Sequence, residues 1–351
     1  MNRKQTKHAR VMRILRGRIA NGVYPGKLPG EKALADELNV DPKSVQIALA
    51  QLEGFGMVRR EWRKGTFAVP PGRTSQKLFA RLLMPYPFID TGEMSFWAFA
   101  VVYGFQQAAC RHGMSMVTEY AGGPDTLIQD AVRGSEVSGC VGTCVLATDL
   151  TTRELLALSD TDTPVVIADQ VPAEAVVPSV AFDNYGAGRL SAAHLVGLGH
   201  TRVGVLWCAQ RTPQPARDRL RGALACLEKA GVRAVTRYCY NTGESAPTLR
   251  ALLADPAGPT AVICMETSQA ELLIELAEKV EREVPGQLSV VTFGESRIIR
   301  NHHITMAHMD HIALGEAALA AILDEDLIDN PRAVLLPVKM SPGATAGAPP
   351  A

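Results

Sequence analysis

The chain has 351 residues, of which 47% are hydrophobic and 21% charged, which is typical of a globular protein of two or three domains. It has no run of about 18 apolar residues that would predict a membrane span, and its basic N-terminus lacks the apolar core of a signal peptide, so we expect a cytoplasmic protein. The formal net charge of +0 hides an asymmetry, because residues 1–73 contain 15 Lys or Arg against 6 Asp or Glu and the remainder contains 21 against 30, which indicates a polyanionic partner for the first segment.

Two amphipathic helices open the chain. Apolar residues recur at helical spacing over residues 10–20, with arginines between them, and predict the first helix. After a turn rich in Gly and Pro, a second helix is expected over residues 30–38. In this helix Ala33, Leu34 and Leu38 should face inward.

A third helix follows, with Asp41 as its N-cap and Pro42 at the first helical position, where the missing N–H costs nothing. Its apolar positions share one face and should form a core: Val45, Ala48, Leu49 and Leu52. The opposite face then carries Lys43, Ser44, Gln46 and Ile47. Residues at the N-terminus of such a helix reach base edges when it lies in the major groove of DNA. A Gln suits a bidentate contact with adenine, and a Lys suits guanine or phosphate.

A basic hairpin completes this segment. Two short strands are expected over residues 57–60 and 65–69, joined by a loop that ends in glycine. Arg63 and Lys64 at its tip would meet the DNA backbone or the minor groove. The candidate DNA contacts are Lys32, Lys43, Ser44, Gln46, Arg63, Lys64 and Gly65.

The motif residues of this segment are Leu28-Pro29-x-Glu31-Lys32-x-Leu34-Ala35, then Val40 to Leu52, then Gly56 and Gly65-Thr66-Phe67. They resemble the GntR-type winged helix-turn-helix. The resemblance implies a DNA-binding domain over residues 1–69 that binds a palindromic operator as a homodimer. The family usually has Ser-Arg early in the recognition helix and an Arg later, where this chain has Asp41-Pro42 and Gln46. The usual operator preference therefore does not transfer. A winged helix used only for protein contacts is the alternative.

Residues 70–77 are rich in Pro, Gly and polar residues and predict a linker. From residue 78 onward short apolar strands alternate with amphipathic helices, which predicts parallel sheets with helices on both faces. The strands are expected at 78–84, 114–119, 139–146, 164–169, 202–207, 234–239, 260–264, 287–293 and 333–339. The helices are expected at 95–112, 125–134, 152–159, 186–198, 216–230, 245–254, 268–283 and 312–324. We therefore expect a two-lobed α/β body over residues 78–340 and a disordered tail over residues 341–351.

A series of short motifs runs through the second half of the body. In order, they are Phe182-Asp183-Asn184-x-x-Ala187-Gly188-Arg189-Leu190, His194-Leu195-x-x-Leu198-Gly199-His200-x-Arg202-Val203, Arg219-x-x-Gly222, Pro259-Thr260-Ala261-Val262, Val284-Pro285-x-x-Leu288-Ser289-Val290-Val291 and Leu314-Gly315-x-x-Ala318. This series resembles the sensor of LacI-type repressors, which has a periplasmic-binding-protein-like fold. The resemblance implies that a small effector, here a carbohydrate, binds between two lobes and releases the DNA.

The same resemblance suggests effector-binding residues. In that family the Arg of Arg-x-x-Gly fixes a pair of sugar hydroxyls, which points to Arg219, and a carboxylate often stands at the place of Asp169. Glu266 and Glu295 follow strands where the family usually has Asn-Asp and Gly-Phe-Asp-Asp, so the hydrogen-bonding pattern of the pocket changes. Aromatic residues after the first strand could stack on a sugar face: Tyr86, Phe88, Phe96 and Trp97.

Each of these residues has a second interpretation. The aromatic residues could equally form lobe core or a dimer surface. Arg219 could be a solvated helix residue, and the two glutamates could be surface carboxylates.

Other functional classes lack their characteristic residues. The seven cysteines form no Cys-x-x-Cys and most lie in apolar runs, so we expect reduced thiols. The histidine-rich segment 302–311 has no regular ligand spacing, and we expect no metal site and no cofactor. We see no phosphate-binding loop and no nucleophile motif, and predict no enzyme. The sequence predicts a repressor controlled by a small molecule. The alternative is a regulator whose sensor only dimerises or binds a non-sugar ligand.

Overall fold

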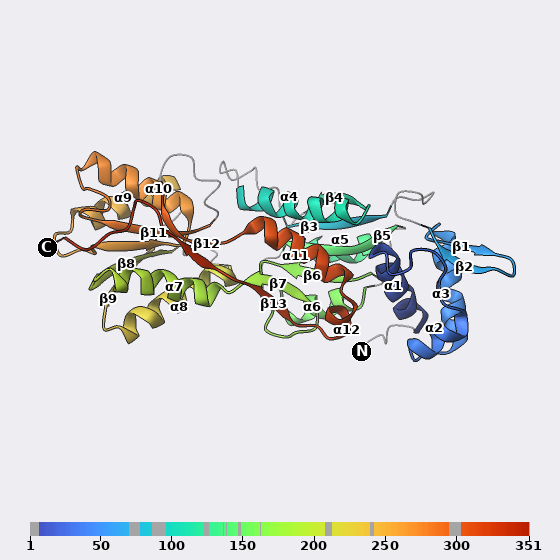
Figure 1. Cartoon of the computed structure of the whole chain (residues 1–351). Coiled ribbons are helices and arrows are strands. Elements are labelled where there is room, and N and C mark those ends of the chain that lie inside the picture. The colour runs from blue at the N-terminus through green and yellow to red at the C-terminus, as the bar shows by residue number, and fades with distance from the viewer. Residues whose placement is uncertain are drawn as a thin grey trace. The chain divides into compact units, whose positions relative to one another are not determined.

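The computed structural model describes residues 7–69, 78–85, 96–122, 126–135, 137, 139–146, 149–161, 163–207, 213–238, 242–294 and 303–350. The chain divides into two compact units, one of Met1–Ala181 with Ile312–Val334 and one of Phe182–His311 with Leu335–Ala351. Each unit contains one six-stranded sheet, and the first unit also contains the N-terminal head (Figure 1). Among the described residues no helix is both long and apolar enough to cross a membrane.

Three helices and a hairpin form the head: α1 (Lys7–Ala20), α2 (Glu31–Glu37), α3 (Pro42–Gly54), β1 (Val58–Glu61) and β2 (Gly65–Ala68). α3 begins as predicted, because the Asp41 carboxylate accepts the backbone N–H of Ser44 at 2.9 Å and Pro42 stands at the start of the helix. β1 and β2 pair antiparallel, with Val58 opposite Ala68. The linker predicted over residues 70–77 lies outside the described residues.

The head core follows the predicted helical spacing except at one position. The apolar stripe of α3 is fully buried: Val45, Ala48, Leu49 and Leu52. In α2, Leu34 and Leu38 are buried as expected, but Ala33 is exposed and Ala35 is buried instead. At about 100° per residue, Ala35 lies about 60° around the helix from Leu38, whereas Ala33 lies about 140° away and so falls outside the buried face.

The sheet of the first unit has the strand order β13-β7-β6-β5-β3-β4. Its strands are β3 (Phe79–Met84), β4 (Ser115–Tyr120), β5 (Cys140–Leu146), β6 (Val165–Ala168), β7 (Ser179–Phe182) and β13 (Ala333–Leu336). The neighbours from β4 through β3, β5 and β6 to β7 pair in parallel. Every residue of β5 is buried, as an apolar strand inside a parallel sheet should be. The helices are α4 (Phe96–Arg111), α5 (Leu127–Ser135), α6 (Thr152–Ser159), α11 (His311–Leu323) and α12 (Glu325–Asp329), although His311 itself belongs to the second unit.

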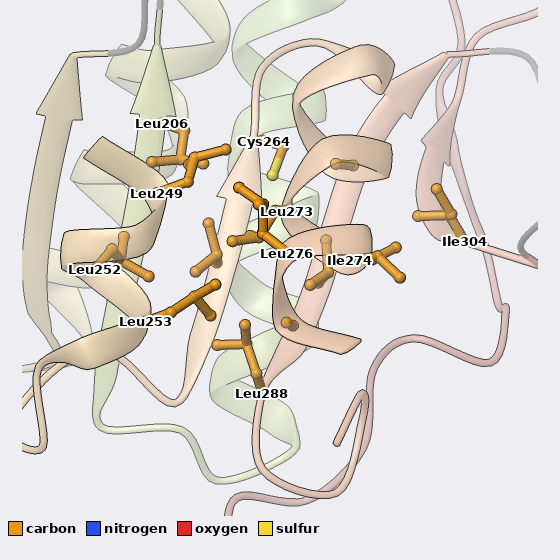
Figure 2. Close-up of a cluster of buried hydrophobic side chains, with 14 of the residues drawn as sticks. Leu206, Leu249, Leu252, Leu253, Cys264, Leu273, Ile274, Leu276, Leu288 and Ile304 are labelled. Atoms are coloured by element: carbon orange, nitrogen blue, oxygen red, sulfur yellow. The ribbon is translucent and has the colours of Figure 1, made fainter. Parts of the chain in front are cut away.

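The sheet of the second unit has the strand order β14-β12-β11-β10-β8-β9. Its strands are β8 (Arg202–Trp207), β9 (Arg233–Tyr238), β10 (Ala261–Cys264), β11 (Ser289–Gly294), β12 (Thr305–His308) and β14 (Lys339–Ser341), and its helices are α7 (Asn184–Gly197), α8 (Gln214–Lys229), α9 (Thr242–Ala254) and α10 (Thr267–Lys279). Figure 2 shows leucines of α9 and α10 packed against strand residues such as Leu206 and Cys264. All strand pairs are parallel except that of β12 with β14.

The predicted alternation of strands and helices is confirmed, with specific omissions. β7, β12 and α12 were not predicted; each has only four or five residues, although the equally short β6 and β10 were predicted from their apolar runs. The single strand expected over residues 333–339 is two strands, β13 and β14, which belong to different sheets. Pro337 stands between them, and proline has no N–H with which to continue a ladder.

The prediction of a disordered tail is wrong for residues 341–350. Thr345 is only 5% exposed. Its backbone oxygen accepts the Val290 N–H at 2.7 Å, and its hydroxyl donates to the Val290 oxygen at 2.7 Å and accepts the Thr305 N–H at 2.9 Å. Gly347 continues the contact, with its N–H donating to the Ser289 hydroxyl at 3.0 Å. Composition misled the prediction because Gly, Ala and Pro show no period, yet their backbone groups can still bind the sheet.

Candidate DNA-binding surface and effector site

The first turns of α3 present one exposed polar face. Lys43 and Gln46 are exposed. Ile47, the next residue along the helix, is 38% exposed. Ser44 does not belong to this face. It is 8% exposed and its hydroxyl donates to the Asp41 carboxylate at 2.8 Å, so it stabilises the helix start. Hydrogen bonds from the Ser44 hydroxyl and amide hold the pKa of Asp41 below its usual value.

Arg60 of β1 contacts the backbone of α3 at this face. Its guanidinium donates to the backbone oxygen of Gln46 at 3.3 Å and pairs with Glu53 at 3.5 Å and Glu31 at 3.7 Å. Arg60 therefore joins the hairpin to the start of α2 and to α3. Lys32, the residue after Glu31, is exposed in the first turn of α2.

The hairpin tip carries the remaining predicted contacts. Arg63, Lys64 and Gly65 are all exposed. Arg63 adopts a left-handed backbone conformation with φ of 61°, and Gly65 has φ of 114°. A Cβ at position 65 would lie 2.8 Å from the Cε of Lys27, so glycine also gives the Lys27 side chain room to cross the hairpin.

Helix α1 of the head contacts α12 within the first unit, which the sequence did not reveal. Arg13 pairs with Asp329, and Arg10 reaches the same carboxylate at 3.4 Å. Arg18 donates to Glu325 at 2.8 Å. The partners are more than 300 residues apart in the sequence, and the acidic run around α12 was their only local signal.

Two further polar contacts join α1 to the same unit. The Asn21 side chain donates to the backbone oxygen of Leu323, the last residue of α11, at 3.0 Å. Arg16 is 4% exposed and donates to the backbone oxygen of Cys140 at the start of β5. The arginines of α1 are therefore partly used to hold the head against its own unit.

In the second unit, Arg219 is held at the carboxyl edge of the parallel sheet. It projects from α8, donates to the backbone oxygen of Met265 at 3.1 Å, and places its guanidinium 5.3 Å from the centre of the Phe293 ring. Met265 follows β10 and Phe293 lies near the end of β11. Ligands of parallel α/β folds bind at this edge, so the position of Arg219 fits an effector contact.

Close packing of α7 on α8 explains the Arg-x-x-Gly spacing. A Cβ on Gly222 would collide with the backbone oxygen of Tyr185, and a Cβ on Gly188 would collide with that of Arg219. The two glycines thus let the helix backbones touch, and this contact fixes the base of the Arg219 side chain.

Glu266, Thr267 and His311 lie around Arg219 or near the same edge. Glu266 is exposed directly before α10, and its N–H donates to the Gln269 side chain at 3.3 Å. Thr267 donates to the Phe293 oxygen at 3.0 Å. His311 is 7% exposed and packs edge-on against Phe182, with ring centres 5.2 Å apart. Burial, together with the charge of Arg219, lowers the pKa of His311 to about 4.

The other predicted effector residues are in the first unit or undescribed. Asp169 follows β6 at the carboxyl edge of its sheet, is half-buried, has φ of 64°, and donates its N–H to the Val180 oxygen at 2.9 Å. Phe96 and Trp97 begin α4, and Trp97 is half-buried. Glu295 lies outside the described residues, as do Tyr86 and Phe88. In the described part of the chain, no three His, Cys, Asp or Glu side chains gather as a metal site would require.

Two family models match this chain. The gntR family of bacterial regulatory proteins matches residues 7–68. The family of periplasmic binding proteins and sugar binding domains of the LacI family matches residues 82–338. These ranges coincide with the head and with most of the two-sheet body.

Relatives and solved structures agree with these matches. The transcriptional regulator reg1 of Streptomyces lividans is 29% identical over 277 residues, covering 72% of this chain and 78% of its own. GalR of Escherichia coli is 31% identical over 154 residues, covering 42% and 44%. The regulator CelR in complex with cellobiose has a TM-score of 0.64 at 18% identity over 87% of this chain and 91% of its own. A LacI-type regulator of Enterococcus faecium with bound ribose has a TM-score of 0.62 at 17% identity over 77% and 98%.

Proposed function

Because the chain belongs to the family of periplasmic binding proteins and LacI sugar-binding domains and carries a gntR-type head, we propose that it is a repressor that leaves its operator when a carbohydrate binds. The chain is a DNA-binding transcriptional regulator. We further propose that it forms a homodimer, binds a palindromic operator and acts in the cytoplasm.

The proposal rests on the presence of a DNA-binding head and a two-sheet body in one chain. The head presents Lys43 and Gln46 on the exposed start of α3, where a recognition helix reads bases. The body holds Arg219 at the carboxyl edge of a parallel sheet, where such folds bind ligands. An arginine stacked on Phe293 combines a hydrogen-bond donor with an apolar face, and both suit a sugar.

A second candidate function is favoured by the residues near Arg219. Exposed Glu266 stands where the sugar-binding family usually has Asn-Asp, and an acidic side chain there also suits a cationic or amine-bearing effector. In that case the chain remains a regulator but answers to a non-sugar ligand.

A route from the effector site to the head is supported by α11. His311, whose pKa is lowered partly by the charge of Arg219, is the first residue of this helix. Leu323 is its last residue and accepts a hydrogen bond from Asn21 of the head. Because α11 begins at the last residue of one stretch of the second unit and continues into the first unit, we propose that it carries the effector signal to the head. Coupling of about 1–3 kcal/mol would suffice for effector control.

The test measures binding of the full chain to a duplex selected from random-sequence DNA, with and without a panel of mono- and disaccharides. We expect one sugar to weaken binding. Arg219→Ala should bind DNA as the wild type does and lose the sugar response, whereas Gln46→Ala should lose about 1–3 kcal/mol on the duplex. A sugar that tightens binding would contradict the repressor model. Specific binding indifferent to all sugars but relieved by an amine would support the second candidate.

A further inference from the structure

The hairpin tip of the head carries a tryptophan that the predicted DNA contacts do not include. Trp62 is 86% exposed, and the next most exposed large apolar side chain among the described residues, Val23, is 55% exposed. Single exposed apolar residues are ordinary on protein surfaces. The exposure of Trp62 alone therefore implies no function.

The base of the hairpin is hydrogen-bonded to the segment that precedes α2. Leu28 donates its N–H to the Thr66 oxygen at 2.9 Å, and Ala68 donates to the Gly26 oxygen at 2.8 Å. The Lys64 N–H closes the loop by donating to the Glu61 oxygen at 3.0 Å. β1 and β2 appear in Figure 1 as a narrow pair of strands beside the helices of the head. A narrow, anchored hairpin of this kind fits a DNA groove.

At this tip, the side chains of Trp62 and Arg63 contact each other. The Arg63 guanidinium lies 5.8 Å from the centre of the Trp62 ring, in the range of a cation–π contact. The left-handed backbone of Arg63, with φ of 61°, turns its side chain back over the ring. Glu61 pairs with Arg59 at 2.9 Å and with Lys64 at 3.4 Å, while no carboxylate of the described residues forms an ion pair with Arg63. The charge at the tryptophan is thus net positive.

We propose that Trp62 and Arg63 together enter the minor groove beside the site read by α3, and that Trp62 makes the protein prefer A·T pairs there. Minor-groove binders combine an arginine, which is attracted to the strong negative potential of a narrow A·T groove, with an apolar side chain that contacts the groove floor or opens a base step. The guanine amino group protrudes into this groove and blocks a flat ring from its floor. Trp62 thereby adds sequence preference at positions that the recognition helix does not touch.

The experiment varies only the flanks of a duplex selected from random DNA with the wild-type chain. The flanks contain A·T, I·C or G·C pairs, because I·C resembles A·T in the minor groove and G·C in the major groove. Binding is measured at constant salt near physiological strength. We expect the wild type to bind the A·T and I·C duplexes alike and the G·C duplex more weakly. This comparison needs no variant and so does not depend on the folding of one.

Three variants assign the preference to the tip. Trp62→Ala should lose about tenfold on A·T and I·C flanks and keep only the small preference that Arg63 gives, and Trp62→Phe should recover most of the wild-type preference. Gln46→Ala is the matched control, which should weaken binding to all three duplexes and keep the preference. The proposal is overturned if I·C behaves as G·C, if Trp62→Ala keeps the full wild-type flank preference, or if Trp62→Ala loses affinity equally on all flanks. A changed oligomeric state of Trp62→Ala in sedimentation, with DNA binding intact, would also overturn it.

Discussion

The ion pairs between α1 and α12 should stabilise the head measurably, and Asp329→Asn is the substitution that tests this. Asp329 accepts from both Arg13 and Arg10, and its side chain is 30% exposed, against 14% for Arg13. Burial lowers the pKa of the Arg13 guanidinium, although Asp329 acts in the opposite direction. Arg13 therefore depends on this carboxylate for compensation of its partial burial.

The expected magnitude lies between two limits. Exposed ion pairs contribute about 0.2–1 kcal/mol, and breaking a fully buried pair costs about 3–5 kcal/mol. The half-buried Arg13–Asp329 pair should therefore contribute about 1–2 kcal/mol to the free energy of opening the head. Such a loss raises the open population roughly 5–30-fold.

Hydrogen exchange of the α3 backbone amides, followed by mass spectrometry, measures this opening directly. In Asp329→Asn the amides over Val45 to Leu52 should exchange about 5–30-fold faster than in the wild type. Asp326→Asn is the matched control, because Asp326 lies on the same helix but pairs with Arg332 at 2.8 Å and not with the head. Exchange of α3 within twofold of the wild type in Asp329→Asn would show that the reasoning is wrong.

Two further predictions concern the second unit. His311 has a pKa of about 4 when folded, below its unfolded value, so the unfolded chain binds the proton more readily. Stability should fall by about 2–3 kcal/mol as the pH drops from about 6.5 to 4.5, and His311→Phe should flatten this slope in urea titrations. Removal of the chain after Met340 should cost about 2–4 kcal/mol in the same assay, because the three hydrogen bonds of Thr345 to Val290 and Thr305 are lost. Thr345→Val should lose only the two bonds of its side chain, and equal stability of all three chains would contradict the ordered tail.

The head could be predicted in detail because its signals are local. The Asp41 cap, Pro42 and the apolar stripe of α3 lie within a dozen residues, and each acts through the backbone next to it. The one local failure that mattered for function was Ser44. Spacing placed it on the exposed face, but its hydroxyl is bound to Asp41 and its side chain is buried.

The effector site was predictable only as far as Arg219. Its position followed from the resemblance, and its contact with Met265 was not visible because 46 residues separate the two. Phe293 lies in a strand as predicted, but the sequence does not show that its ring contacts Arg219. The sequence offers His311 only as a candidate metal ligand. Sequence spacing cannot show which strand ends share one edge of a sheet, since strand order is set by tertiary packing.

The charge asymmetry of the sequence has a different meaning once the arginine contacts are known. The excess of basic residues in the first 73 positions predicts a polyanionic partner for the head. Six arginines of the described head are bound within the protein instead: Arg10, Arg13 and Arg18 to α12, Arg16 to the backbone of Cys140, and Arg59 and Arg60 to carboxylates of the head itself. The cations left exposed at the start of α3 and at the hairpin tip are few, and they flank the side chains suited to reading bases. Four arginines of α1 therefore bind the head to the rest of the first unit, and the charge left to meet DNA is smaller than the sequence count.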